Sequence, residues 1–271
     1  MAFNSFSFWF VFPFIFGFYW LIPAKYNQWR KVFLVLASYL LYMNWRPAFA
    51  LVLLGVTLVT YWGGQVLQVQ GEELTVQGVQ GFKSSRRKRL AWCFALLALL
   101  PLLVFKYYNF LNDSISTGLI SIGLQFSMPG LNWAVPVGIS FFTFQAVGYM
   151  LDVYHGRVKA ENNLLDYVLF VSFFPQVTSG PISTAEELMP QIKATHKFDY
   201  EQGKQGLKQL LWGMFIKLVI ADRLGLFVDT VYANYVHYSG ATCFVASVFY
   251  TYPFSFLRIL GMSTFPRNCA C

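Results

Sequence analysis

The segment that decides the fold is "NLLDYVLFVSFFPQVTSGPI", residues 163–182. Its first half is apolar, as expected of a helix in a membrane or at its surface, but helix breakers follow at Pro175, Gly180 and Pro181. Proline removes a backbone donor and clashes with the preceding turn. Gln176 stands among these breakers, so polar groups and irregular backbone meet at the end of an apolar run. Either the chain only turns here, or the break serves a purpose.

The composition indicates an integral membrane protein. Of 271 residues, 56% are hydrophobic, 20% aromatic and 12% charged, and the mean hydropathy is +0.49. Soluble domains carry about 25% charged residues, and a helix needs about 20 mostly apolar residues to span a bilayer. We therefore predict an all-α, polytopic integral membrane protein with about six to eight membrane segments, some short or re-entrant. The candidate segments are 5–23, 30–45, 48–68, 90–106, 133–151, 164–178, 207–228 and 240–260.

The net charge of +8 lies mostly in segments between apolar runs. Basic residues cluster at 25–31 and again in "KSSRRKR" (83–89), whereas the intervening turn holds only Arg46. This pattern is typical of cytoplasmic loops and does not indicate nucleic-acid binding. We predict that both basic segments face the cytoplasm, with the N-terminus outside. Segment 69–82 would be a cytoplasmic loop, and segment 111–133 an external loop or a set of short interfacial helices.

The sequence carries no motif of a soluble enzyme. It has no phosphate-binding loop, no G-x-G-x-x-G and no G-x-S-x-G, and His155, His196 and His237 lack metal-ligand spacing. The four cysteines form no Cys-x-x-Cys pair. We therefore predict no metal site and no bound cofactor. The N-terminus has no basic region and no cleavage site, so its apolar run is expected to remain as a span.

Polar residues inside apolar runs are the remaining candidates. In "PVGISFFTFQAVGYMLDVYHG" (136–156), helical spacing places Gln145, Tyr149 and Asp152 on one face, with Thr143 nearby. Polar groups at membrane depth are costly unless they are paired or line a wet cavity. Hydrogen bonding between helices and lining of a cavity both explain them.

Lys217 raises the same question within "LLWGMFIKLVIADRLGLFVD" (210–229). Its ammonium group would either pair with a carboxylate on another segment or reach the interface on its long stem. The nearby charges Asp222 and Arg223 favour the second interpretation.

Three blocks in order resemble a known family: "PVGISFFTFQAVGYMLDVYHG" (136–156), "DYVLFVSFFPQVTSGPI" (166–182) and "GLKQLLWGMFIKLVIADRLGLFVDTVY" (206–232). They are similar to the membrane-bound O-acyltransferases, in particular to the bacterial polysaccharide (alginate) O-acetylase branch. The resemblance implies a multi-pass protein of the bacterial inner membrane with a funnel-like cavity, which transfers an acetyl group toward an extracellular polysaccharide. The acyl donor would be acetyl-CoA or an acyl carrier. The partners would be the bilayer and periplasmic or extracellular glycan-acetylation proteins. A related branch transfers D-alanyl groups toward teichoic acid.

In such a family, irregular backbone at membrane depth is tolerated where it lines the cavity. The breakers at 175–181 would then present polar groups to a substrate, although a simple turn toward a surface helix explains them as well. The candidate substrate-binding residues are Gln145, Tyr149, Gln176, Ser179, Gly180 and Lys217.

The chain departs from the family pattern in two ways. The family's essential histidine lies further along a longer chain, and none of the three histidines here matches it, so the catalytic residue is unknown and we expect little activity from this chain alone. We interpret residues 1–250 as the N-terminal portion of an O-acyltransferase domain. Residues 251–271 form an atypical tail, either from a reading-frame shift near residue 252 or as a divergent genuine end. A transporter subunit and an inactive scaffold of a glycan-modification complex remain rival functions.

Overall fold

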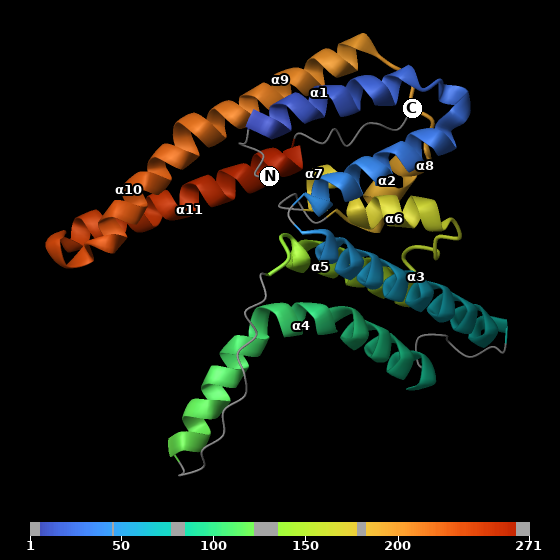
Figure 1. Ribbon diagram of the computed structural model, residues 1–271, viewed down its shortest axis with the longest axis horizontal. Coiled ribbons are helices and arrows are strands. Elements are labelled where there is room, and N and C mark those ends of the chain that lie inside the picture. The colour runs from blue at the N-terminus through green and yellow to red at the C-terminus, as the bar shows by residue number, and fades with distance from the viewer. Residues whose placement is uncertain (1–5, 45, 77–84, 122–134, 178–182, 264–271) are drawn as a thin grey trace. The chain divides into compact units, whose positions relative to one another are not determined.

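The computed structural model describes residues 6–44, 46–76, 85–121, 135–177 and 183–263. Every regular element within these ranges is helical and none is a strand, which confirms the predicted all-α class (Figure 1). The chain divides into two compact units, Met1–His196 and Lys197–Cys271.

The first unit is a bundle with an aromatic core. Its elements are α1 (Phe6–Leu21), η1 (Ala24–Tyr26), α2 (Asn27–Met43), α3 (Pro47–Val76), α4 (Ser85–Ser121), α5 (Ile139–Tyr154), α6 (Leu164–Ser172), α7 (Phe174–Val177) and α8 (Ala185–Lys193). Helix α3 packs against α4 and α5, and α2 packs against α6 (Figure 1). The largest fully buried side chains include Tyr42, Phe142, Tyr149, Tyr167 and Phe170. Aromatic packing therefore joins α2, α5 and α6.

Two of the described helices are long and apolar enough to cross a membrane. They are Pro47–Gly71 within α3 and Ser85–Tyr108 within α4, which match the predicted segments 48–68 and 90–106. For the other predicted segments, no helix within the described residues meets both criteria, and their crossing of a bilayer stays a prediction. Helix α4 is bent in Figure 1 and contains Pro101, which lacks the N–H that would continue the helical hydrogen bonds.

Two glycines bring α3 close to its neighbours. A Cβ on Gly64 would lie 3.0 Å from the Tyr149 ring, and one on Gly63 would lie 3.0 Å from both the Met150 sulfur and the Phe94 ring. Small residues at such contacts let helix backbones approach closely, as they do in membrane bundles. The Gly63–Gly64 pair therefore sets the spacing of the layer that carries Tyr149.

Polar contacts join the starts of several helices in the first unit to neighbouring helices. Lys31 Nζ lies 2.7 Å from Asp166 Oδ1, which joins the starts of α2 and α6. Arg87, at the start of α4, donates to the Leu67 carbonyl of α3 at 3.1 Å and to the Val153 carbonyl near the end of α5 at 3.4 Å. The starts of α2 and α6 therefore lie beside each other, and the start of α4 lies beside the later parts of α3 and α5. That the basic starts of α2 and α4 face the cytoplasm stays a prediction.

The segment 69–82 was expected to be a loop, and that prediction was wrong in part, because helix α3 continues to Val76. The segment 111–133 was expected to be an external loop or a set of short interfacial helices, whereas its described part continues the long helix α4 to Ser121. Glu and Gln are good helix formers, so a polar stretch does not end a helix. Gly71 also packs there, because a Cβ at this position would meet the Arg87 guanidinium at 3.0 Å.

The second unit contains α9 (Tyr200–Phe215), the π-helical segment η3 (Ile216–Ala221), α10 (Asp222–Ala233), η4 (Tyr235–His237) and α11 (Gly240–Ser263). Asp199 caps α9 by accepting from the N–H of Glu201 at 2.8 Å. Helices α10 and α11 are joined by a 2.7 Å hydrogen bond between the Tyr232 and Ser247 hydroxyls. Helix α11 continues without interruption past residue 251, where the atypical tail was predicted to begin.

Candidate functional site

The predicted break after the apolar run is present between α6 and α7. Asn163 caps α6 by accepting from the Leu165 N–H at 3.0 Å, and the helix ends at Phe173, whose ψ is 113°. Helix α7 then begins at Phe174, with Pro175 in its first turn. Since proline has no N–H, the helix cannot close its hydrogen bond across this point. The proline therefore contributes to the break at this point.

Gln176 lies just after the break and is 95% buried, being 5% exposed. Its Nε2 donates to the Ser183 hydroxyl at 3.0 Å, while its buried Oε1 has no hydrogen-bond partner among the described residues. The buried Thr143 hydroxyl of α5 likewise lacks a described partner. Buried polar atoms are nearly always hydrogen-bonded. The Gln176 oxygen is thus a buried acceptor without a partner among the described residues.

Gln145 and Tyr149 are both buried in α5 and both bind backbone. Gln145 Nε2 donates to the Phe170 carbonyl at 2.9 Å. The Tyr149 hydroxyl accepts from the Glu161 N–H at 2.8 Å. The Gln145 bond joins α5 to α6, the interhelical kind that the first interpretation of these residues anticipated, and the Tyr149 bond reaches the segment before α6. A role for either residue in substrate binding stays a prediction.

The segment 160–163, which precedes α6, is held by a polar clamp from α3. Tyr61 donates to the Asn162 carbonyl at 2.8 Å, Gln65 donates to the Glu161 carbonyl at 2.6 Å, and Gln68 accepts from the Ala160 N–H. The Tyr167 hydroxyl, one turn into α6, donates to Thr60 Oγ1 at 2.7 Å. The start of α6 is therefore fixed before the break is reached.

Buried charges tie the same region to α2. Lys31 and Asp166 are 9% and 4% exposed, and their 2.7 Å contact is an ion pair inside the unit. Arg30 is also buried, and it donates to the carbonyls of Ile22 and His196 at 2.6 to 2.8 Å. Both residues were predicted to lie in a basic cytoplasmic loop that ends where the predicted segment 30–45 begins. That loop assignment was wrong for them, because both lie in the first turns of α2 (Asn27–Met43).

The remaining predicted residues fall elsewhere. Ser179 and Gly180 lie outside the described residues. The backbone of Lys217 lies in the π-helical segment of the second unit; π segments often occur at functional sites. Asp152 does not join the buried face; it lies 3.4 Å from Arg157 at the surface. Among the described residues, no group of three His, Cys, Asp or Glu side chains forms a potential metal site.

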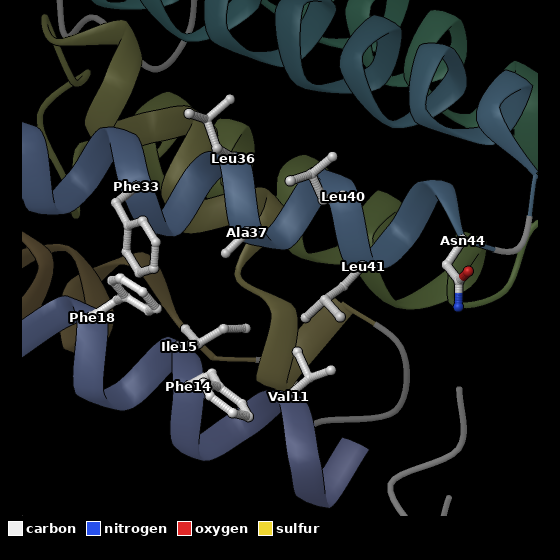
Figure 2. Close-up of a pocket in the computed structure, with 10 residues that line it drawn as sticks. All are labelled: Val11, Phe14, Ile15, Phe18, Phe33, Leu36, Ala37, Leu40, Leu41 and Asn44. Atoms are coloured by element: carbon white, nitrogen blue, oxygen red, sulfur yellow. The ribbon is translucent and has the colours of Figure 1, made fainter. Parts of the chain in front are cut away.

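A separate groove of about 650 Å³ runs between α1 and α2, and Figure 2 shows its side chains. It is lined by Val11, Phe14, Ile15, Phe18, Phe33, Leu36, Ala37, Leu40, Leu41 and Asn44. Apart from Asn44, which follows the end of α2, every lining residue is apolar. Such a groove suits hydrocarbon and offers no group for acyl-transfer chemistry, so the break is the stronger candidate site.

The fold and the site together define a class: an all-helical protein of membrane-protein composition, with hydrogen-bonding groups at a helix break inside the bundle. Comparison with known proteins then narrows this class. The chain is 34% identical over 236 residues to a probable alginate O-acetylase, AlgI, of Pseudomonas syringae pv. tomato, and equally to its counterpart in Pseudomonas aeruginosa. Each alignment covers 86% of this chain and 42% of the relative. The chain thus spans less than half the length of these relatives.

More distant relatives carry related names. A peptidoglycan O-acetyltransferase of Helicobacter pylori is 28% identical over 260 residues, which cover 86% of this chain and 46% of the relative. A teichoic acid D-alanyltransferase of Bacillus subtilis is 26% identical over 150 residues, which cover 54% of this chain and 35% of the relative. No family model matches the chain, and no solved structure matches it.

Proposed function

We propose that this chain carries part of a multi-pass O-acyltransferase of the bacterial inner membrane, which transfers an acetyl group toward an extracellular polysaccharide. The observation that supports the proposal most is the 34% identity to two probable alginate O-acetylases over 86% of the chain. The buried Gln176 oxygen, which has no hydrogen-bond partner among the described residues, would supply a polar group to a substrate. The donor would be acetyl-CoA or an acyl carrier, and glycan-acetylation proteins outside the membrane would be partners.

The chemistry sets out what each group would have to do. A sugar hydroxyl attacks the acyl carbonyl, so a base must take the hydroxyl proton and donors must stabilise the developing oxyanion. Gln176 and Thr143 would orient a hydroxyl-bearing substrate by hydrogen bonds, and the fixed start of α6 would hold them in place. No residue of this chain is assigned as the base. We therefore expect membranes that contain this chain alone to transfer little or no labelled acetyl group.

A chimera tests the proposal. In a Pseudomonas aeruginosa strain that lacks its own probable alginate O-acetylase, the aligned region of that protein is replaced by this chain, and the acetyl content of secreted alginate is measured. We expect the chimera to restore acetylation and Gln176→Ala within it to abolish most of the gain. The control, Gln191→Ala, removes an amide that only donates to the Glu187 carbonyl on the surface of α8. A chimera that reaches the membrane at the level of the intact relative but adds no acetyl groups would contradict the proposal.

D-alanyl transfer toward teichoic acid is the second candidate, because a teichoic acid D-alanyltransferase aligns with 54% of the chain. The two candidate functions are separated by the same chimera design in Bacillus subtilis. There the chain replaces the aligned region of the teichoic acid D-alanyltransferase, and the D-alanine content of the cell wall is measured. Restoration in that species alone would favour D-alanyl transfer. A transporter subunit or an inactive scaffold predicts restoration in neither.

A further inference from the structure

The break between α6 and α7 separates two backbone groups that a continuous helix would join. In such a helix the Phe174 N–H would donate to the Phe170 carbonyl four residues earlier. Instead, the Phe174 N–H donates to the Ser38 hydroxyl of α2 at 3.2 Å, and the Phe170 carbonyl accepts from Gln145 Nε2 of α5 at 2.9 Å. Each half of the missing hydrogen bond is thus taken by a side chain from a different neighbouring helix.

Pro175 alone does not account for this geometry. Proline removes the donor for the Val171 carbonyl, one position further on, and many membrane helices pass such a point with only a kink. Separating the Phe170 and Phe174 groups as well would leave two more unpaired groups in the interior, each costly. Ser38 and Gln145 are 1% and 4% exposed, so water does not compensate for their loss.

We infer that Ser38 and Gln145 are positioning residues that hold the helix open at Phe173 and thereby place the Gln176 side chain. With the break held open, the Gln176 N–H bonds to the Phe173 carbonyl at 2.9 Å and its side chain reaches Ser183. In a continuous helix, Gln176 would instead share a face with Ser172 and Phe173, at three and four residues' spacing. The functional meaning of this placement rests on the proposed function, whereas the placement itself does not.

The test uses nuclear magnetic resonance on the chain in lipid nanodiscs, so its result does not depend on acyl transfer. Ser38→Ala removes the acceptor of the Phe174 N–H. We expect hydrogen exchange at that amide to accelerate at least about tenfold, the factor that corresponds to about 1.4 kcal/mol. The side-chain amide resonance of Gln176, assigned by its loss in Gln176→Ala, should shift in the same variant. Ser38→Thr keeps a hydroxyl and should restore both signals.

Ser172→Ala is the matched control, because Ser172 is equally buried at 1% exposed but donates only to the Val168 carbonyl within α6. In this variant the exchange rate of the Phe174 amide should stay within about twofold of the unmodified protein. The Gln176 side-chain resonance should not shift. Gln145→Met keeps the side-chain length without the donor and should move the Phe170 carbonyl carbon resonance upfield. The inference is overturned if Ser38→Ala leaves the Phe174 amide and the Gln176 resonance unchanged, or if it changes all of α6 as much as it changes Phe174.

Discussion

The buried ion pair between Lys31 and Asp166 yields the sharpest stability prediction. Its atoms lie 2.7 Å apart, and the two side chains are 11% and 5% exposed. At an effective dielectric constant of about 20, the mutual attraction is roughly 6 kcal/mol. Removing both charges from water costs a comparable amount, so the pair as a whole adds little, but removing one partner leaves an uncompensated charge inside the protein. Lys31→Met and Asp166→Leu should therefore each lower the free energy of unfolding by about 3–5 kcal/mol.

The double variant distinguishes this reasoning from simple loss of packing. Lys31→Met combined with Asp166→Leu removes both charges and should cost less than either single change, with a coupling energy above about 2 kcal/mol. The assay is equilibrium unfolding in mixed detergent micelles, followed by helical circular dichroism. The exposed pair Lys204 and Glu201, at 3.7 Å, serves as control, and Lys204→Met should cost less than about 0.5 kcal/mol. The argument would be refuted if each single change cost less than about 1 kcal/mol and the cost of the double variant equalled the sum of the two single costs.

The same unfolding assay checks three further changes. Gly64→Val should destabilise the first unit by about 1–3 kcal/mol because the new methyl groups meet the Tyr149 ring, whereas Gly148→Ala, with open space around its Cβ position, should be neutral or stabilising. Tyr149→Phe should cost about 1–3 kcal/mol by leaving a buried N–H without an acceptor, and Tyr61→Phe should cost less because its hydrogen bond is exposed. Arg87→Lys should also destabilise the first unit. An ammonium group cannot reproduce both backbone hydrogen bonds of the guanidinium group and its stacking on the Tyr154 ring, whose centroid lies 5.1 Å away. Equal costs within either matched pair, or an unaffected Arg87→Lys variant, would contradict these explanations.

The local features of the fold could be predicted from sequence because their causes are local. Apolar runs of sufficient length predicted the helices, and Pro175 predicted the end of α6 near where it occurs. The basic residues at 83–89 were predicted to form a loop, which was wrong for residues 85–89, because these form the first turns of α4. Arg86, Lys88 and Arg89 are exposed there, as basic residues beside an apolar run are expected to be, whereas Arg87 is buried. Each of these inferences needs only neighbours along the chain.

The partners of the polar residues could not be predicted, because they lie far apart in sequence. Lys31 and Asp166 are 135 residues apart, and the Ser38 hydroxyl meets an N–H 136 residues away. One signal was overlooked: Tyr61, Gln65 and Gln68 recur at helical spacing, which places them on one face of α3. Such a stripe predicts a polar contact, although it does not identify the segment that is bound.

The distribution of polarity in the first unit explains why a helix break is stable there. Charged and polar side chains such as Lys31, Asp166 and Gln145 are buried, whereas Phe14 and Leu40 are 65% and 67% exposed. Soluble proteins show the opposite tendency for charged residues. In hydrocarbon, outward apolar groups cost nothing, and every backbone group freed by a break must find a partner inside the protein. A break at membrane depth can therefore form only where neighbouring helices concentrate hydrogen-bonding side chains. Because those same side chains add hydrogen-bonding groups to an otherwise apolar core, we expect irregular backbone and tolerance of a polar substrate to occur at the same place for one physical reason.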